Sequence, residues 1–106
     1  MFPSLPAVTV GELAAIVTAD PSTPVIDVRE PAEYAAGHVP SAELIPMSVV
    51  PVRLQDIAKG RTVYLVCRTG GRSAQAVGWL NQQGYDAVNV TGGTAAWTAA
   101  GFPVST

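Results

Sequence analysis

The single cysteine of this sequence is followed by residues that could make it a nucleophile. Cys67 comes directly after the apolar run 62–66 and begins the segment Cys-Arg-Thr-Gly-Gly-Arg-Ser, residues 67–73. Gly70 and Gly71 allow positive φ angles, so the loop can turn its backbone N–H groups inward around the sulfur. Those groups and the positive end of a following helix attract an anion and lower the pKa of a thiol. The pattern therefore predicts a nucleophilic Cys67 thiolate at neutral pH.

Arg68 and Arg72 in the same segment support this interpretation. Their planar guanidinium groups suit a sulfur or oxygen anion at the rim of the loop, and Thr69 and Ser73 complete it. The alternative is a buried cysteine that merely ends a core strand, which is the common fate of a lone cysteine. The glycine pair, the two arginines and the helix start favour the reactive cysteine over that alternative.

Short apolar runs alternate with helical patterns along the chain. Strands are predicted at 25–28, 62–66 and 86–90, with a shorter one at Leu44-Ile45. Helices are predicted from the capping-box pair Thr9 and Glu12, from Pro31 up to Gly37, and over 49–59, 73–83 and 95–100. This alternation predicts an α/β fold, with a mainly parallel sheet covered by helices on both faces. Ligands of such sheets bind beyond the carboxyl ends of the strands, which is where Cys67 falls.

Length and composition limit the class of protein. The 106 residues fit a single domain, 1–106, and 48% of them are hydrophobic against 13% charged, which is typical of a folded globular chain. The net charge of −2 argues against a nucleic-acid partner, since such binders normally carry a basic excess. No apolar run approaches the ~20 residues of a membrane span, so no membrane partner is expected.

The cysteine and histidine counts exclude further kinds of site. One cysteine cannot form an internal disulfide, and Cys67 with the single histidine, His38, does not make a tetrahedral zinc site. We therefore expect neither a metal nor another cofactor. The first residues show no basic region and no continuous apolar run, so no signal peptide is expected. A free thiol without an export signal predicts a cytoplasmic location.

Four motifs in order along the chain resemble the rhodanese, or sulfurtransferase, domain family. They are Asp-Val-Arg-Glu-Pro at 27–31 with Glu33 and Tyr34, Gly-His-Val-Pro at 37–40, the segment 67–73, and Gly92-Gly93 with Trp97 and 101–103. Each motif alone is weak, but together they cover nearly the whole chain. Ser41 replaces the family's usual glycine and Leu44 a frequent asparagine, and both departures affect the loop before the short strand.

The resemblance implies a rhodanese-like fold, with a central parallel sheet of five strands flanked by helices. It implies that Cys67 accepts a sulfane sulfur and becomes a persulfide, cradled by the backbone amides of residues 68–73. It also matches Asp27, Arg29, Glu33 and His38 to family positions, which we interpret mainly as a hydrogen-bonded scaffold near the loop. Buried polar groups need partners, and Asp27 is expected to accept backbone N–H groups rather than act as a base. Whether Arg29 or His38 also contributes to catalysis stays open, and Trp79 and Trp97 are expected in the core.

The length of the loop separates this family from relatives that handle phosphate. Phosphatases of the same fold carry five residues between the cysteine and the arginine, which makes a ring wide enough for a tetrahedral phosphate. Here only residues 68–71 separate Cys67 from Arg72. The smaller ring suits a single sulfur atom, so phosphatase or arsenate reductase activity is the weaker hypothesis.

The resemblance thus predicts a thiosulfate sulfurtransferase that works by two half-reactions. A small donor, thiosulfate or a low-molecular-weight persulfide, would load Cys67, and a thiol or protein-thiol acceptor would take the sulfur. Two alternatives remain: a persulfide carrier that delivers sulfur to a partner protein, and a non-catalytic rhodanese-like interaction domain. The natural donor, the natural acceptor and the oligomeric state are not determined by the sequence.

Overall fold

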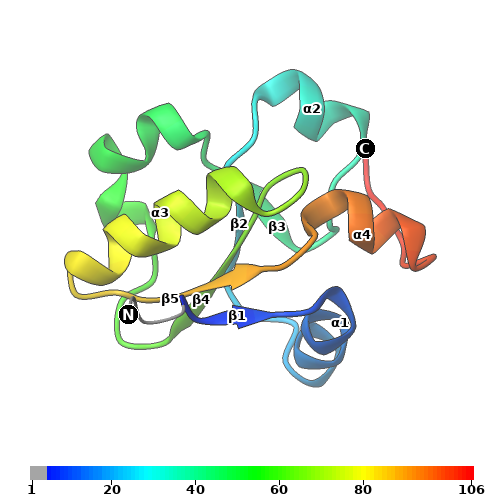
Figure 1. Ribbon diagram of the computed structural model, residues 1–106, viewed down its shortest axis with the longest axis horizontal. Helices are drawn as coiled ribbons and strands as arrows, with labels where there is room; N and C mark the ends of the chain where they lie inside the picture. Colours follow the sequence, from blue (N-terminus) through cyan, green and yellow to red (C-terminus); the bar gives the residue numbers. More distant parts are fainter. Residues whose placement is uncertain (1–4) are drawn as a thin grey trace.

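A parallel sheet of five strands forms the centre of the molecule (Figure 1). The structure, a computed structural model, describes residues 5–106, so most of the segment on which the signal-peptide expectation rests lies outside it. The strands are β1 (Ala7–Val8), β2 (Val25–Asp27), β3 (Ala42–Leu44), β4 (Thr62–Val66) and β5 (Asp86–Val90). Their order in the sheet is β1-β5-β4-β2-β3, with every neighbouring pair parallel.

Residues 5–106 also form four α-helices and two short 3-10 helices, of which α4 follows the last strand and the others connect strands. They are α1 (Val10–Ala19), α2 (Pro31–Ala36), η1 (Met47–Val52), η2 (Leu54–Asp56), α3 (Gly71–Gln82) and α4 (Gly93–Ala99). Thr9 begins α1 with the expected capping box, in which its hydroxyl accepts the N–H of Glu12 while the Glu12 carboxylate accepts the N–H of Thr9. The α/β fold with a five-stranded parallel sheet is therefore confirmed.

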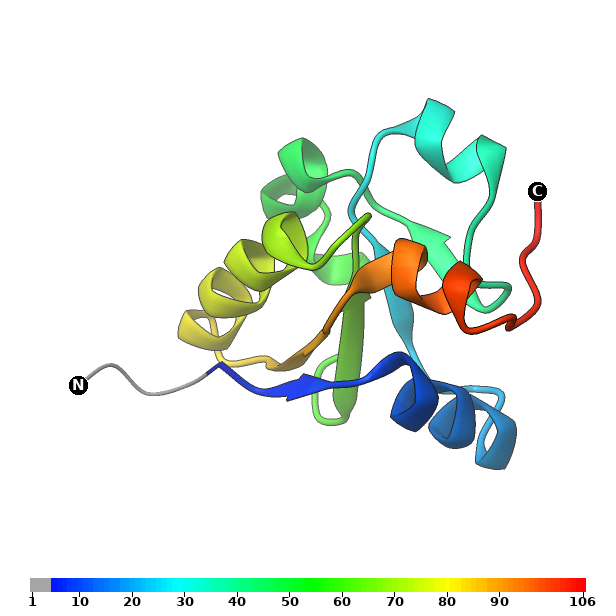
Figure 2. The same cartoon turned by 45° about the vertical axis from the view of Figure 1, so that its right-hand side comes forward.

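Helices cover both faces of the sheet. Leu65 of β4 packs with Leu80 of α3 on one face, and the 3-10 segment adds to the same cluster. Its neighbour Val66 points to the other face and packs with Leu13 of α1 and Trp97 of α4. Figure 2 shows α3 and the pair α1 and α4 on opposite sides of the strands. Strands covered on both faces are mostly apolar, which explains the short hydrophobic runs in the sequence.

The prediction of one helix over 49–59 is wrong. The chain forms η1 and η2 instead, closed by i→i+3 bonds such as Arg53 N–H to the Val50 oxygen at 3.1 Å. Pro51 lies inside η1, where it cannot donate an N–H, and the surrounding valines are poor α-helix formers. These features end each helical turn before an α-helix can extend.

Other boundaries differ by a few residues. The short strand lies at Ala42–Leu44 rather than at 44–45, while α3 and α4 each begin two residues earlier than predicted. Both helices start after a glycine with positive φ, Gly70 at 107° and Gly92 at 80°. The two-residue strand β1 was not predicted, because two residues are too few to show a pattern. Its pairing with β5 holds it in place.

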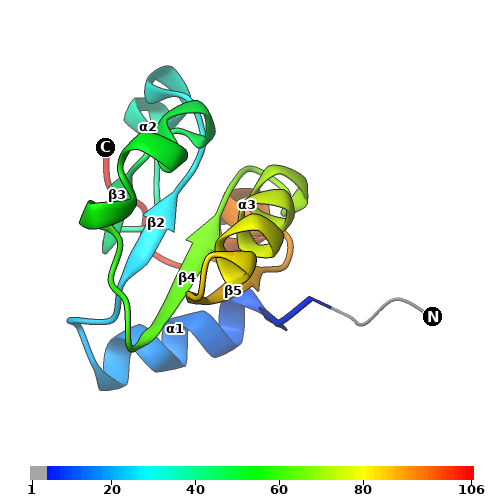
Figure 3. The same cartoon turned by 90° about the vertical axis from the view of Figure 1, so that its left-hand side faces the viewer.

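The carboxyl ends of β2 and β4 lie side by side at the centre of the sheet. The chain leaves β2 towards β3 at one edge and leaves β4 towards β5 on the other side. Figure 3 shows both arrows pointing towards the end of the sheet at which α2 lies. Connections that diverge in this way open a crevice where ligands of parallel sheets bind. Cys67, directly after β4, lies at this point.

The turn between β5 and α4 packs directly on the backbone that follows β4. The N–H groups of Thr94 and Ala95 donate to the carbonyl oxygens of Cys67 and Arg68 at 2.9 and 3.0 Å. A Cβ on Gly93, whose φ is +56°, would collide with the Cys67 carbonyl oxygen. Glycine is therefore required for this close approach.

We expect Gly93→Ala to destabilise the protein more than Gly101→Ala does. Both glycines have positive φ, 56° and 82°, but a Cβ on Gly101 meets nothing within 4 Å. The left-handed conformation costs an alanine about 1–2 kcal/mol at either site, and only Gly93 adds a backbone collision. Urea unfolding followed by tryptophan fluorescence measures the difference, and equal losses would contradict the tight turn.

Candidate active site

The sulfur of Cys67 lies inside the loop that joins β4 to α3. The residue is 1% exposed, and its Sγ accepts the N–H of Gly70 at 3.0 Å and the hydroxyl of Ser73 at 3.3 Å. The left-handed conformation of Gly70 turns this N–H inward, as predicted, whereas Gly71 does not have a positive φ and begins α3. The loop is thus arranged around one sulfur atom.

The environment favours the ionised form of this thiol. Burial raises the pKa of Cys67, but hydrogen bonds from Ser73, Gly70 and Thr69 outweigh it and leave the pKa below its ordinary value. The amides donate to the sulfur and so stabilise its negative charge. A thiolate held in this way is a ready nucleophile.

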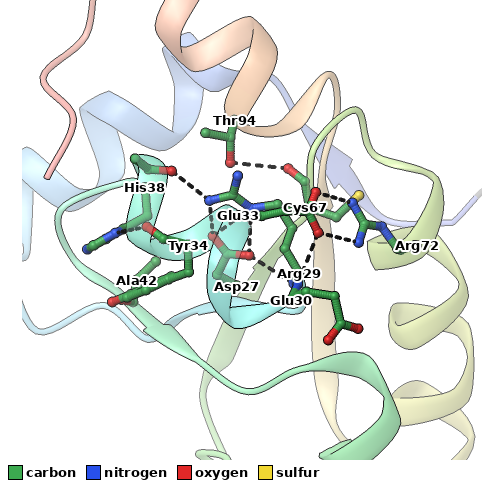
Figure 4. Close-up of polar contacts among 11 residues, drawn as sticks. Asp27, Arg29, Glu30, Glu33, Tyr34, His38, Ala42, Cys67, Arg72 and Thr94 are labelled. Atoms are coloured by element: carbon green, nitrogen blue, oxygen red, sulfur yellow. Dashed lines mark hydrogen bonds and ion pairs between the residues drawn. The ribbon is translucent and has the colours of Figure 1, made fainter. Parts of the chain in front are cut away.

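Arg72 is held by an acidic side chain from across the crevice. Its two terminal nitrogens donate to the two carboxylate oxygens of Glu33 in α2, at 2.8 and 2.9 Å (Figure 4). The pKa of Glu33 is lowered to about 2 by this contact, with a further contribution from the N–H of Glu30. Arg72 therefore lies near the loop as half of a bidentate ion pair, whereas the sequence suggested a guanidinium directed at a substrate anion.

Arg68, Thr69 and Gly71 form the exposed side of the loop. The Arg68 side chain makes no ion pair with any residue from 5 to 106. It borders an open groove of about 550 Å³, which also touches Arg29, Glu33 and Thr94. This volume is within the usual range of ligand sites, so a donor or acceptor molecule has room beside the loop.

Asp27 and Arg29 form a buried ion pair at the end of β2. The guanidinium donates to both Asp27 oxygens at 2.9–3.1 Å and also to the carbonyl oxygen of Gly37 at 2.7 Å. Asp27 additionally accepts the backbone N–H of Arg29 at 3.0 Å. These contacts fix the chain between β2 and α2, and neither side chain hydrogen-bonds to Cys67.

His38 lies away from the sulfur. Its ring stacks on Tyr34 with centroids 3.5 Å apart, and its Nδ1 is 2.8 Å from the Tyr34 carbonyl oxygen. In Figure 4, Asp27 and Arg29 lie between this pair of rings and Cys67. The placement suits a structural role in the loop that joins α2 to β3.

Asn89 and Thr94 are site residues that the sequence analysis missed. Asn89 of β5 is hydrogen-bonded to Ser73 and to Gly70, and the Thr94 hydroxyl donates to the Cys67 carbonyl oxygen at 3.2 Å. An asparagine within a predicted buried strand was the available signal, because asparagine is rare in strands and a buried amide needs partners. Thr94 had no signal beyond its place after the glycine pair.

The fold and the site define an α/β protein with a buried thiol at the carboxyl end of a central parallel strand, in a loop whose Gly70 N–H and Ser73 hydroxyl face the sulfur. Comparison with known families identifies the family to which this chain belongs. The model described as "Rhodanese-like domain" matches residues 9–100, and the chain belongs to this family.

Individual relatives agree with this assignment. A protein of Allochromatium vinosum named "Sulfurtransferase" is 46% identical over 80 residues, which span 74% of this chain and 75% of the relative. The "Putative sulfur carrier protein YrkF" of Bacillus subtilis is 32% identical over 90% of this chain and 52% of its own length. The rhodanese-like domain protein of Staphylococcus aureus superposes with a TM-score of 0.86 and 37% identity, covering 96% of this chain and all of that one.

No helix among residues 5–106 is long and apolar enough to cross a membrane.

The Glu33–Arg72 pair makes stability depend on pH in the acid range. The unfolded chain protonates Glu33 near pH 4.3, whereas the folded protein keeps it ionised down to about pH 2. The pair therefore contributes its full stability above the unfolded pKa and loses it as the pH falls towards 2. We expect the difference in unfolding free energy between wild type and Glu33→Gln to shrink over this range. Urea titrations from pH 6 to pH 2 measure it, and Arg72→Gln is the matched variant that should remove most of the same dependence.

Proposed function

We propose that this protein is a sulfurtransferase that moves a sulfane sulfur from thiosulfate, or a related persulfide donor, to a thiophilic acceptor through a persulfide on Cys67. The observation that supports it most directly is the donor set around the Cys67 sulfur, which is built for one anionic sulfur. The match to the rhodanese-like family and the sulfurtransferase name of a relative at 46% identity support the same reaction.

In the first half-reaction the Cys67 thiolate attacks the outer sulfur of thiosulfate. A bond forms between the two sulfur atoms, the bond from the outer sulfur to the sulfonate sulfur breaks, and its electron pair leaves with sulfite. Cys67 is left as a persulfide whose negative charge lies on the outer sulfur. Because Cys67 is 1% exposed, we expect slim donors with a terminal sulfur to react best.

In the second half-reaction a nucleophile removes the outer sulfur. Cyanide in an assay, or a thiol in the cell, attacks that atom, and the electron pair of the broken sulfur–sulfur bond returns to Cys67 as thiolate. Residues 1–106 contain no second cysteine, so the persulfide cannot close to a disulfide within them. Covalent capture in two steps predicts ping-pong kinetics.

In this mechanism some of the surrounding residues contact the sulfur or the donor, and the others hold the site in place. The loop amides and Ser73 hold the sulfur charge, and Arg68 attracts the anionic donor into the groove. Glu33 orients Arg72, while the Asp27–Arg29 pair and His38 keep the chain after β2 in place. Arg68 borders the groove and has no ion pair within residues 5–106, so it should favour dianionic thiosulfate over mercaptopyruvate, which has one carboxylate.

Brief incubation with thiosulfate should add the mass of one sulfur atom to the reduced protein. Cyanide should remove that mass, and Cys67→Ser should never gain it. Intact-mass spectrometry of both proteins makes the measurement. Sulfur transfer retained by Cys67→Ser would contradict the mechanism.

Arg68→Gln should lower kcat/KM for thiosulfate by about threefold to tenfold, because an exposed charge-assisted contact to the donor is lost. The loss should be smaller for methanethiosulfonate, which carries one negative charge less. Arg61→Gln is the matched control, since Arg61 is a surface arginine paired with Asp20 outside the site. Equal losses with both donors would show that Arg68 does not select by charge.

A persulfide carrier is the second candidate function, favoured by the relative named as a sulfur carrier. A carrier would load one sulfur as readily as an enzyme but would turn over slowly with small acceptors. Comparing the loading rate with steady-state turnover on cyanide and on thiols separates the two functions.

A further inference from the structure

Asn89 is a polar side chain buried between the sheet and the cysteine loop. It is 9% exposed and lies in β5, the strand beside β4 (Figure 1). Its Nδ2 donates to the Gly70 carbonyl oxygen at 3.2 Å, and its Oδ1 accepts the Ser73 hydroxyl at 2.5 Å. Because a carbonyl oxygen can only accept, the amide nitrogen must face Gly70. This contact fixes Oδ1 towards Ser73.

The Ser73 hydroxyl faces two acceptors at once. Its Oγ lies 2.5 Å from Asn89 Oδ1 and 3.3 Å from the Sγ of Cys67, and the residue is fully buried. A hydroxyl carries a single proton, so Ser73 can donate to only one of these atoms at a time. The geometry favours the amide oxygen, which is the closer acceptor.

We propose that Asn89 is a positioning residue that competes with the Cys67 sulfur for the single proton of the Ser73 hydroxyl. When Cys67 is a thiol, Ser73 donates to Asn89 and its lone pair is free to accept the S–H. When Cys67 is a thiolate, Ser73 must turn to the sulfur and leave Asn89 Oδ1 without its donor. A buried acceptor without a donor is costly, so Asn89 disfavours the free thiolate.

This competition has a consequence for sulfur loading, which rests on the proposed function. In the persulfide the negative charge lies on the outer sulfur, and Sγ no longer needs the Ser73 proton. Ser73 can then donate to Asn89 again, and all three groups are satisfied. Asn89 therefore shifts the balance from the free thiolate towards the sulfur-loaded protein.

The substitution used to test this proposal leaves the charged groups around the loop unchanged. Arg72 projects from α3 and Glu33 from α2, and Glu30 directly precedes α2. The Asp27–Arg29 pair lies at the end of β2, and Arg68 belongs to the loop itself. Helix α4 carries no charged residue. Substituting Asn89 with leucine, which has similar size and branching, alters none of these charges.

The test measures the pKa of Cys67 in wild type, Asn89→Leu, Ser73→Ala and the double variant. The ultraviolet absorbance of the thiolate, taken as the difference from Cys67→Ser, reports the titration of the one cysteine without any reagent entering the site. Competition predicts that Asn89→Leu lowers the pKa by about 0.5–1 pH unit, the effect of one hydrogen bond. In the Ser73→Ala background the same substitution should leave the pKa unchanged.

A role limited to holding Gly70 predicts the opposite result. Loss of that support would loosen the loop amide from the sulfur and raise the pKa, with or without Ser73. A raised pKa, or the same change in both backgrounds, would overturn the proposal. Asn89→Asp is the second variant if leucine prevents folding: its carboxylate should raise the pKa, and more strongly with Ser73 than without it. Equal effects in the two backgrounds would overturn the proposal here as well.

A second readout links the competition to sulfur loading. At a fixed ratio of thiosulfate to sulfite, intact mass should show a smaller persulfide fraction in Asn89→Leu than in wild type. An unchanged fraction would overturn the effect on loading. If wild type itself forms no persulfide, the proposed function fails, while the titration still decides whether Asn89 and Cys67 compete for Ser73.

Discussion

The rest of the site depends on holding the Cys67 sulfur where water does not reach it, among donors that lower its pKa. Cys67 is 1% exposed, so the protein itself must supply the hydrogen bonds that water would otherwise give. Gly70 provides an inward N–H because its backbone is left-handed. On the outside of the loop, Thr94 and Ala95 bind the carbonyl oxygens of Cys67 and Arg68, which fixes these peptide planes. The turn after β5 therefore fixes the backbone of the loop after β4, and the close approach of Gly93 makes these contacts possible.

Charge around this centre is organised in pairs across the crevice. Glu33 accepts both the side chain of Arg72 and the backbone N–H of Glu30, so it ties the start of α2 to the start of α3. The buried pair of Asp27 and Arg29 fixes the chain where it leaves β2. Positive charge thus stays near the sulfur while each buried charge has its partner, as a low-dielectric interior requires.

These contacts suit a reaction in which the protein carries charge on sulfur in two alternating forms. The free thiolate has its charge on Sγ, and the proposed persulfide has it one atom further out. Ser73 has one proton and faces both Cys67 and Asn89. In the proposed scheme its hydroxyl donates to Cys67 in the thiolate and to Asn89 in the persulfide. The strand β5 thereby takes part in the chemistry of a loop that the sequence attributes to residues 67–73 alone.

The sequence by itself determined the features that are encoded locally. The buried strands, the capping box at Thr9 and the glycine-containing segment after Cys67 all follow from residue type and short spacing, and together they predicted the α/β fold and the nucleophile. Tertiary structure decided what depends on contacts between distant segments. Three contacts are of this kind: the pairing of β1 with β5, the ion pair between Glu33 and Arg72, and the contact of Asn89 with Ser73. Their partners are at least 16 residues apart in the sequence, and no local pattern records them. Propensity alone also gave an α-helix where the chain forms 3-10 turns around Pro51. Side chains acquire such partners only when the sheet brings the ends of its strands together, which is why the cysteine loop could be predicted and its distant partners could not.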